Sequence, residues 1–248
     1  MRFTKAPASL KNMVAVATGA SSGIGRAIAL ALADAGASVF LVGRHLSNLE
    51  STARNARDKT DRVWVCPTDL RLENETRKLA DMVVREAECL DILILCAGIY
   101  GRGRIDESAA DQLDELYRAN VRAPYFLTQS LLPLLAARQG QVVFVNSSSG
   151  LQAQAMAGQF SATQHALRAM ANALREEVNP AGVRVLNVFP GRTATPRMKA
   201  LYATEGKPYR PEVLMQPEDV ATMIVQALSL PRTAEVTEIH MRPMLKSY

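Results

Sequence analysis

The sequence predicts an α/β fold: a doubly wound, mostly parallel sheet of about seven strands with helices on both faces. Short apolar segments alternate with segments of helical periodicity from one end of the chain to the other, which is typical of a parallel sheet covered on both faces. A glycine-rich stretch, 18–25, joins the first strand-like segment to the first helix-like one. At 248 residues, of which 48% are hydrophobic and 21% charged, the chain fits one domain, 1–248.

The strand-like segments are short and rich in apolar or β-branched residues, and most of them stop at glycine, proline or a polar residue. They cover Met13–Ala17, Ala37–Val42, Arg62–Cys66, Asp91–Leu95, Gln141–Asn146, Val183–Phe189 and Glu235–Met241. Apolar residues at helical spacing predict helices between them. These helices cover Ser22–Ala35, Glu73–Ala87, Ala109–Arg138, Gly158–Asn179 and Pro217–Leu228.

The segment Arg192–Gln216 interrupts this alternation. It holds Pro196, Gly206, Pro208 and Pro211 and shows little periodicity. Long irregular segments inside a compact domain are usually functional and often act as lids. We therefore expect a substrate lid around 192–216.

The composition argues against several kinds of partner. The net charge of +5 is modest and no block of five or more basic residues occurs, so we expect no nucleic acid. No apolar run reaches the roughly 18–20 residues that span a bilayer, so we expect no membrane. The three cysteines form no CxxC pair, and the first residues lack the apolar segment of a secretory signal. We therefore expect reduced thiols, no metal site and a cytoplasmic location.

The glycine-rich loop reads Thr18-Gly19-Ala20-Ser21-Ser22-Gly23-Ile24-Gly25 and lies between a strand and a helix. Glycines let the backbone turn tightly and approach a pyrophosphate, whose charge is met by N–H groups at the helix N-terminus. This context predicts a dinucleotide site rather than a simple turn.

Arg44 follows the second strand, where dinucleotide-binding folds carry an acidic residue that binds a ribose 2′-hydroxyl. A guanidinium group suits a 2′-phosphate instead, because its planar fork pairs with phosphate oxygens. We therefore predict that NADP(H) is preferred over NAD(H). The alternative for Arg44 is a solvated arginine at a strand end.

Together these motifs resemble the classical short-chain dehydrogenase/reductase family, whose glycine loop has the spacing T-G-x-x-x-G-x-G. The resemblance extends roughly from Lys11 to Met244 and implies a Rossmann-type fold. It also implies which residues contact the cofactor: the loop lines the phosphates, Asp69 and Leu70 flank the adenine, and a segment near 190–195 contacts the nicotinamide carboxamide. The implied set is Thr18, Gly19, Ser21, Ser22, Gly23, Ile24, Gly25, Arg44, Asp69, Leu70, Cys96, Ala97, Gly98, Gln164, Pro190, Gly191, Thr193 and Thr195.

The resemblance also assigns the catalytic positions, and two of them depart from the family. Asn120 and Ser147 match the family's Asn and Ser. Phe160 and Gln164 stand where the family carries Tyr-x-x-x-Lys. In the family the Tyr hydroxyl transfers a proton, and the Lys on the same helix face binds the nicotinamide ribose and lowers the pKa of the Tyr. Phe160 has no proton to give, and Gln164 has no charge.

Simpler interpretations exist for these residues. Ser147 and its neighbours suit a polar strand-to-loop cap, Phe160 a core aromatic, and Gln164 a polar surface position. Other side chains could supply a proton from nearby loops: Tyr100, Arg192, Lys199, Lys207 and Tyr209. His165 follows Gln164 but points about 100° away around the helix.

Three hypotheses fit the sequence. The chain is an NADP-dependent carbonyl or alcohol oxidoreductase by descent, with weak activity or activity rerouted through another donor. Alternatively, it is a non-catalytic nucleotide-binding sensor or assembly subunit. In the third hypothesis the two replacements were engineered to inactivate a reductase.

The small-molecule substrate stays unidentified, and the resemblance implies a homodimer or homotetramer formed through the two long helices. Both helices carry apolar stripes that suit such an interface, although stripes of this kind more often face the chain's own core. The stripe residues are Leu113, Leu116, Leu127, Leu131 and Leu135 on one helix and Ala166, Leu167, Met170 and Leu174 on the other.

Overall fold

A computed structural model describes residues 9–245. Residues 1–8, to which the expectation of no secretory signal refers, lie outside the described residues. In the described part, seven strands form one sheet in the order β3-β2-β1-β4-β5-β6-β7, and every pairing is parallel. The strands are β1 Val14–Thr18, β2 Ser38–Gly43, β3 Val63–Pro67, β4 Ile92–Leu95, β5 Gln141–Val145, β6 Arg184–Pro190 and β7 Glu238–Met241. The predicted fold class is confirmed.

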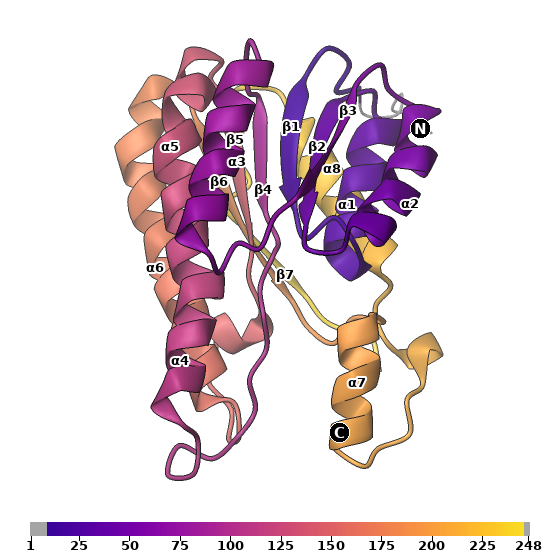
Figure 1. The fold of residues 1–248 in the computed structure, drawn as a ribbon, viewed down its shortest axis with the longest axis vertical. Coiled ribbons are helices and arrows are strands. Elements are labelled where there is room, and N and C mark those ends of the chain that lie inside the picture. The colour runs from indigo at the N-terminus through magenta and orange to yellow at the C-terminus, as the bar shows by residue number, and fades with distance from the viewer. Residues whose placement is uncertain (1–8, 246–248) are drawn as a thin grey trace.

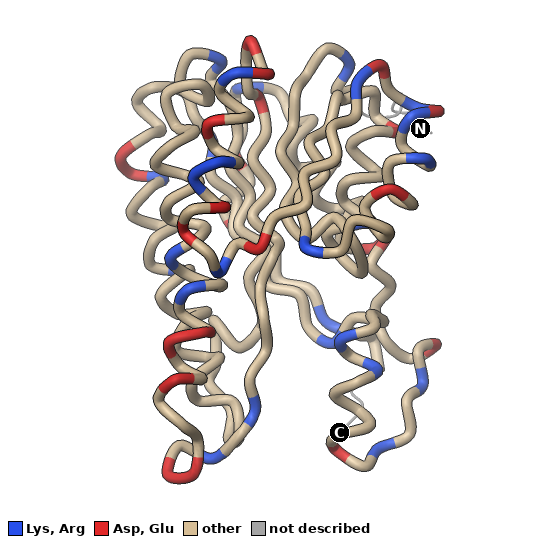
Figure 2. Tube along the Cα trace, viewed as in Figure 1, with Lys and Arg blue, Asp and Glu red and all other residues tan. Residues whose placement is uncertain are grey.

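Helices cover both faces of this sheet (Figure 1). One face packs against α1 Gly23–Asp34, α2 Leu46–Arg57 and α8 Pro217–Leu228. The other packs against α3 Glu73–Glu86, α5 Ala123–Ala137 and α6 Gly158–Val178, with α4 Ala110–Tyr117 beside α6. Charged residues lie mainly on the helices and loops, while the central strands carry almost none (Figure 2). The buried strands therefore read as continuous apolar runs.

Helix α2 was not predicted. Its buried face consists of Leu49, Thr52, Ala53 and Ala56, which have helical spacing but contain only one large apolar side chain. Small residues give a weak periodic signal, so the pattern did not stand out.

The single helix predicted over 109–138 is in fact two α-helices, α4 and α5, joined by a π-helical turn at Arg118–Arg122. Such turns are often found at functional sites, because the extra residue changes the direction of a side chain. Asn120 lies at the centre of this turn and is buried.

The segment 192–216 is less irregular than predicted. It contains helix α7, Pro196–Thr204, which lies apart from both layers, beyond the carboxyl end of β6 (Figure 1), and a short 3₁₀ turn at 211–213. Thr195 starts α7, because its hydroxyl accepts a hydrogen bond from the Met198 N–H at 3.1 Å, and Pro196 occupies the first helical position. One of the prolines in this segment, Pro196, therefore begins a helix.

Most of the apolar stripe residues face the chain's own core. Leu116, Leu127, Leu131, Leu135 and Leu167 are all buried within the chain. Leu113, Ala166, Met170 and Leu174 keep exposed or partly exposed surface. In the described residues, no helix is long and apolar enough to cross a membrane.

Candidate functional site

A cavity of about 350 Å³ opens at the carboxyl ends of the strands, between the segments that follow β1 and β4. These neighbouring strands lead in opposite directions across the sheet, which makes this a topological switch point, the usual ligand site of such folds. Most of the predicted site residues line it. They are Gly19, Ser21, Ser22, Gly23, Ile24, Gly25, Arg44, Asp69, Leu70, Cys96, Ala97, Gly98, Asn120, Phe160, Gln164 and Thr195.

The glycine loop forms one wall of the cavity. Gly19 and Gly23 have φ values of +74° and +54°, which favour glycine over residues with side chains. Gly25 lies against the Gly19 carbonyl so closely that a Cβ atom would clash with it. Ser22 makes no side-chain capping bond at the start of α1. The first N–H groups of this helix are therefore available to an anion.

Thr18 does not line the cavity and instead joins the ends of β1 and β4. Its hydroxyl donates to the Ile94 carbonyl at 3.1 Å and accepts from the N–H groups of Cys96 and Ala97 at 2.9 and 3.0 Å. Burial raises the pKa of the Cys96 thiol to about 12, so the thiol is neutral at physiological pH. The Thr18 hydroxyl thus holds the backbone after β4, where Cys96 and Ala97 line the cavity.

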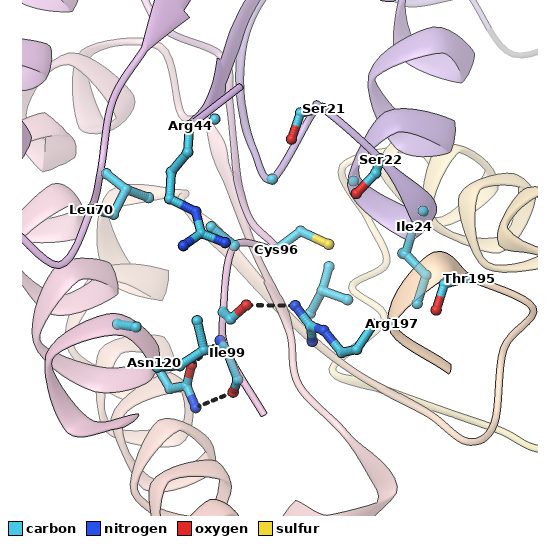
Figure 3. A pocket seen from close by; sticks show the side chains of 18 of the residues that line it. Ser21, Ser22, Ile24, Arg44, Leu70, Cys96, Ile99, Asn120, Thr195 and Arg197 are labelled. Atoms are coloured by element: carbon cyan, nitrogen blue, oxygen red, sulfur yellow. Dashed lines mark hydrogen bonds between the residues drawn. The ribbon is translucent and has the colours of Figure 1, made fainter. Parts of the chain in front are cut away.

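Arg44 and Asp69 lie at the end of the cavity that the resemblance assigns to the adenosine. Arg71 donates hydrogen bonds to the Asp69 carboxylate from Nε and from its terminal nitrogen, and these bonds hold the pKa of Asp69 below its usual range. Arg44 points into the cavity (Figure 3) and has no hydrogen bond or ion pair to another described residue. A cation in this state can bind an anionic ligand.

Asn120 links the loop after β4 to helix α6. Its Oδ1 accepts from the Ile99 N–H at 2.8 Å, and its Nδ2 donates to the Ile99 carbonyl at 3.0 Å and to Thr163 Oγ1 at 3.1 Å (Figure 3 shows Asn120 against Ile99). Thr163 in turn donates to the Phe160 carbonyl at 2.7 Å. Asn120 therefore fixes the backbone beside the cavity with every polar atom of its amide group.

Phe160 and Gln164 lie one helical turn apart on α6 and both face the cavity. Phe160 is 8% exposed, and Gln164 is 5% exposed, so the surface alternative for Gln164 is wrong. The Phe160 ring meets the Tyr100 ring edge to face, with centroids 4.8 Å apart. Gln164 Nε2 has only a long contact, 3.4 Å, to Thr163 Oγ1. Neither position offers the cavity an acid or a positive charge.

Ser147 behaves as the strand-to-loop cap considered above. Its Oγ accepts from the Ser149 N–H at 3.1 Å, and it does not line the cavity. Sequence reasoning missed its neighbour Asn146, which does line the cavity and donates from Nδ2 to the Gln164 carbonyl at 3.0 Å. Asn146 thereby holds the cavity-facing turn of α6 against the end of β5.

The segment after β6 divides into a supporting part and a lining part. Thr193 is buried and donates to the Gly191 carbonyl at 3.1 Å, and neither of them, nor Pro190, lines the cavity. Thr195 does line it, and so does Arg197, which the sequence did not indicate. The role of the first three as cofactor contacts stays a prediction.

The alternative proton donors are spread over several places. Tyr100 packs against Phe160, whereas Arg192 and Lys207 form ion pairs with Glu205. Lys199 is exposed, and the Tyr209 ring packs against Tyr202 at 5.8 Å. His165 is exposed on the helix, and its Nδ1 lies 2.9 Å from the carbonyl of the residue one turn earlier. Tyr100 is thus the candidate in contact with Phe160. Within residues 9–245, no group of three or more His, Cys, Asp or Glu side chains could hold a metal ion.

Comparisons with known proteins agree with this geometry. The family model for short chain dehydrogenase matches residues 13–206. An uncharacterized oxidoreductase of Staphylococcus aureus is 32% identical over 236 residues, covering 95% of this chain and 99% of that protein. L-sorbose reductase from Gluconobacter frateurii, solved with NADPH and L-sorbose, has a TM-score of 0.88 at 26% identity and covers 98% of this chain and 100% of its own. An alcohol dehydrogenase from the archaeon Thermococcus sibiricus, solved with 5-hydroxy-NADP, has a TM-score of 0.85 at 26% identity, with coverage of 95% and 98%. The chain belongs to the short-chain dehydrogenase family.

Proposed function

We propose that the cavity binds NADP(H) in preference to NAD(H). The observation that carries this is the position of Arg44, an arginine that faces the adenosine end of the cavity and forms no direct ion pair among the described residues, while the nearby Asp69 carboxylate is bound by Arg71. A 2′-phosphate would form a direct ion pair with this guanidinium group, whereas a 2′-hydroxyl would not. Several similar solved structures hold NADP, which supports the same choice.

By descent the chain is a carbonyl or alcohol oxidoreductase, and we propose that its activity is weak or rerouted. The cofactor supplies the hydride when it is bound. The chain's own residues hold the backbone and the nucleotide, but Phe160 and Gln164 supply no proton and no charge on the face of α6 that lines the cavity. Loss of a positioned acid typically costs about 10²–10⁴ in rate. Tyr100 packs against Phe160 and is our candidate for a substitute donor.

The second candidate function is that of a non-catalytic nucleotide-binding sensor or assembly subunit. The packed and largely buried Phe160 favours it, because the position is filled by a stable aromatic contact rather than by a polar group waiting for a substrate. This hypothesis predicts NADPH binding without turnover and a protein partner that is lost when the cofactor site is blocked. The same outcome without a partner would fit a reductase inactivated by design.

A homodimer or homotetramer and a cytoplasmic location are also part of the proposal. The residual exposed surface of Leu113, Met170 and Leu174 on the long helices supports self-association. A light-scattering mass equal to that of the monomer would contradict it.

Equilibrium titration of the purified chain with NADPH, with NADH in parallel, tests the proposed function. We expect micromolar binding of NADPH and weaker binding of NADH. Tighter binding of NADH would contradict the cofactor preference. If neither nucleotide binds, Gln164 and Cys96 have removed the cavity's affinity for its cofactor. This result would favour a role in assembly.

A further inference from the structure

Arg197 is the second residue of α7, and its positively charged side chain lines the cavity. Its guanidinium donates a hydrogen bond to the Gly98 carbonyl, so a side chain from beyond β6 reaches the backbone that follows β4. Figure 3 shows this group between Ile24 and Thr195 on one side and Ile99 on the other. It therefore occupies the middle of the cavity, between the α1 N-terminus and the Asn120 loop.

Two arginines thus face one cavity. Figure 3 shows the guanidinium groups of Arg44 and Arg197 directed into the same space from opposite walls. In the described residues neither has an ion pair with a carboxylate, whereas the third arginine of the lining, Arg71, is bound to Asp69. Arginine stays protonated in proteins, so this charge cannot be removed by titration. An anion that enters the cavity could pair with these guanidinium groups directly.

The surroundings of Arg197 also oppose its charge. Its pKa is lowered, first because dense protein around the guanidinium disfavours the charged form and then because Arg44 is nearby. The side chain still reaches solvent through the open side of the cavity, so water screens part of this cost. The Gly98 carbonyl is a neutral acceptor, and a hydrogen bond to a charged phosphate oxygen is roughly twice as strong.

The rest of the middle wall contains no positive side chain. Gln164, at the position where the family carries a ribose-binding Lys, is neutral, and its amide nitrogen makes only the long contact to Thr163. Ser21 and Ser22 offer hydroxyl groups, and the start of α1 offers N–H groups. A pyrophosphate over this helix start would lie beside Arg197.

We propose that Arg197 binds the pyrophosphate of the dinucleotide and so couples the closure of α7 to cofactor binding. This inference rests on the proposed function. Arg44 and Arg197 then bind different phosphate groups. Arg44 binds the 2′-phosphate that distinguishes NADPH, and Arg197 binds the pyrophosphate that NADPH and NADH share. On binding, the Arg197 guanidinium exchanges the Gly98 carbonyl for phosphate oxygens, and α7 is held over the cavity.

Binding of three probes to two variants tests this division. The probes are NADPH, NADH and adenosine 2′-monophosphate, which carries the 2′-phosphate but no pyrophosphate. Arg197→Met should weaken NADPH and NADH alike by about tenfold or more and leave adenosine 2′-monophosphate unchanged. Arg44→Ser should weaken NADPH and adenosine 2′-monophosphate and leave NADH unchanged. Arg210→Met is the matched control, because Arg210 is an exposed arginine of the same segment, paired with Glu212 and absent from the cavity lining.

Lysine-specific proteolysis reports on the lid itself without using Arg197 as a cleavage site. In the natural chain, saturating NADPH should slow cleavage after Lys199 and Lys207 and leave cleavage after the remote Lys59 unchanged. In Arg197→Met this protection should be lost at NADPH concentrations that saturate the variant. Arg197→Lys keeps the charge but adds a lysine cleavage site, so it is compared by NADPH titration instead, and it should retain part of the affinity.

The outcomes separate the two claims. If the natural chain binds no nucleotide, the proposed function fails. If the natural chain binds NADPH and Arg197→Met binds it equally well or more tightly, the pyrophosphate role of Arg197 is overturned, and tighter binding would identify the side chain as an obstruction. Unequal weakening of NADPH and NADH by Arg197→Met would also overturn it. An unchanged unfolding midpoint of the unliganded variant excludes misfolding as the cause.

Discussion

The ring of Phe160 meets the ring of Tyr100 edge to face, with centroids 4.8 Å apart and planes at 61°. This contact joins helix α6 to the loop after β4 across the wall of the cavity. Pairs of this kind contribute about 0.5–1.5 kcal/mol beyond the area that they bury. Phe160 therefore forms a packed aromatic contact, and the partner ring, Tyr100, carries a phenol hydroxyl.

Tyr100→Phe should reduce any residual NADPH-dependent turnover by about 10²-fold, because it removes the one hydroxyl of this pair and keeps both rings. The measurement is kcat for NADPH oxidation at saturating carbonyl substrate. NADPH affinity should stay unchanged, since Tyr100 does not line the cavity. Tyr209→Phe is the control, and equal turnover in Tyr100→Phe and the natural chain would exclude Tyr100 as the donor.

Asn120→Ala should lower the free energy of unfolding by about 2–4 kcal/mol, because it leaves the Ile99 N–H and carbonyl and the Thr163 hydroxyl without the partner they have now. Urea unfolding of the unliganded protein measures this. Asn172→Ala is a suitable control, since Asn172 is exposed and accepts a single hydrogen bond from Arg175. Equal unfolding midpoints for the two variants would refute the role given to Asn120.

The side chain of Glu205, which follows the last residue of α7, is 5% exposed and makes the stability of the lid depend on pH. Burial acts to raise the pKa of its carboxyl, but Arg192, Lys207 and Arg102 outweigh burial, and the pKa lies below the ordinary value of 4.5. A carboxylate with a lowered pKa stabilises the folded lid above about pH 4.5, and this contribution is lost as the pH falls through the lowered pKa.

Hydrogen exchange in residues 196–206 should therefore rise below pH 4.5 after correction for the intrinsic exchange rate. In Glu205→Gln exchange should be fast at neutral pH already and change little in acid. Glu212→Gln is the matched control, since Glu212 is exposed and pairs only with Arg210. A similar pH profile in the natural chain and Glu205→Gln would show that this cluster does not hold the lid.

The sequence predicted the sheet well, because most strands are apolar runs that stop at a turn residue, and the glycine loop and Arg44 predicted the dinucleotide site. The prediction failed where the buried side chains of an element are small, or where a residue acts through a contact far away in the sequence. Helix α2 buries mostly small side chains. Asn146 and Arg197 act through carbonyls that lie 18 and 99 residues away in the chain, and no local pattern encodes such contacts. Ser147 and Thr193 were predicted by their spacing; their side chains form hydrogen bonds with their own neighbours, and their roles at the site stay predictions.

The double substitution Phe160→Tyr with Gln164→Lys tests the central claim most directly: that this site lacks only a proton donor and the charge that tunes it. We would compare initial rates of NADPH oxidation for the natural chain, each single variant and the double variant, over a panel of carbonyl compounds at saturating NADPH. The account predicts a gain of about 10²-fold or more in the double variant and smaller gains in the single variants, because the two residues act as a unit. No gain on any carbonyl tested, with NADPH binding intact, would contradict it.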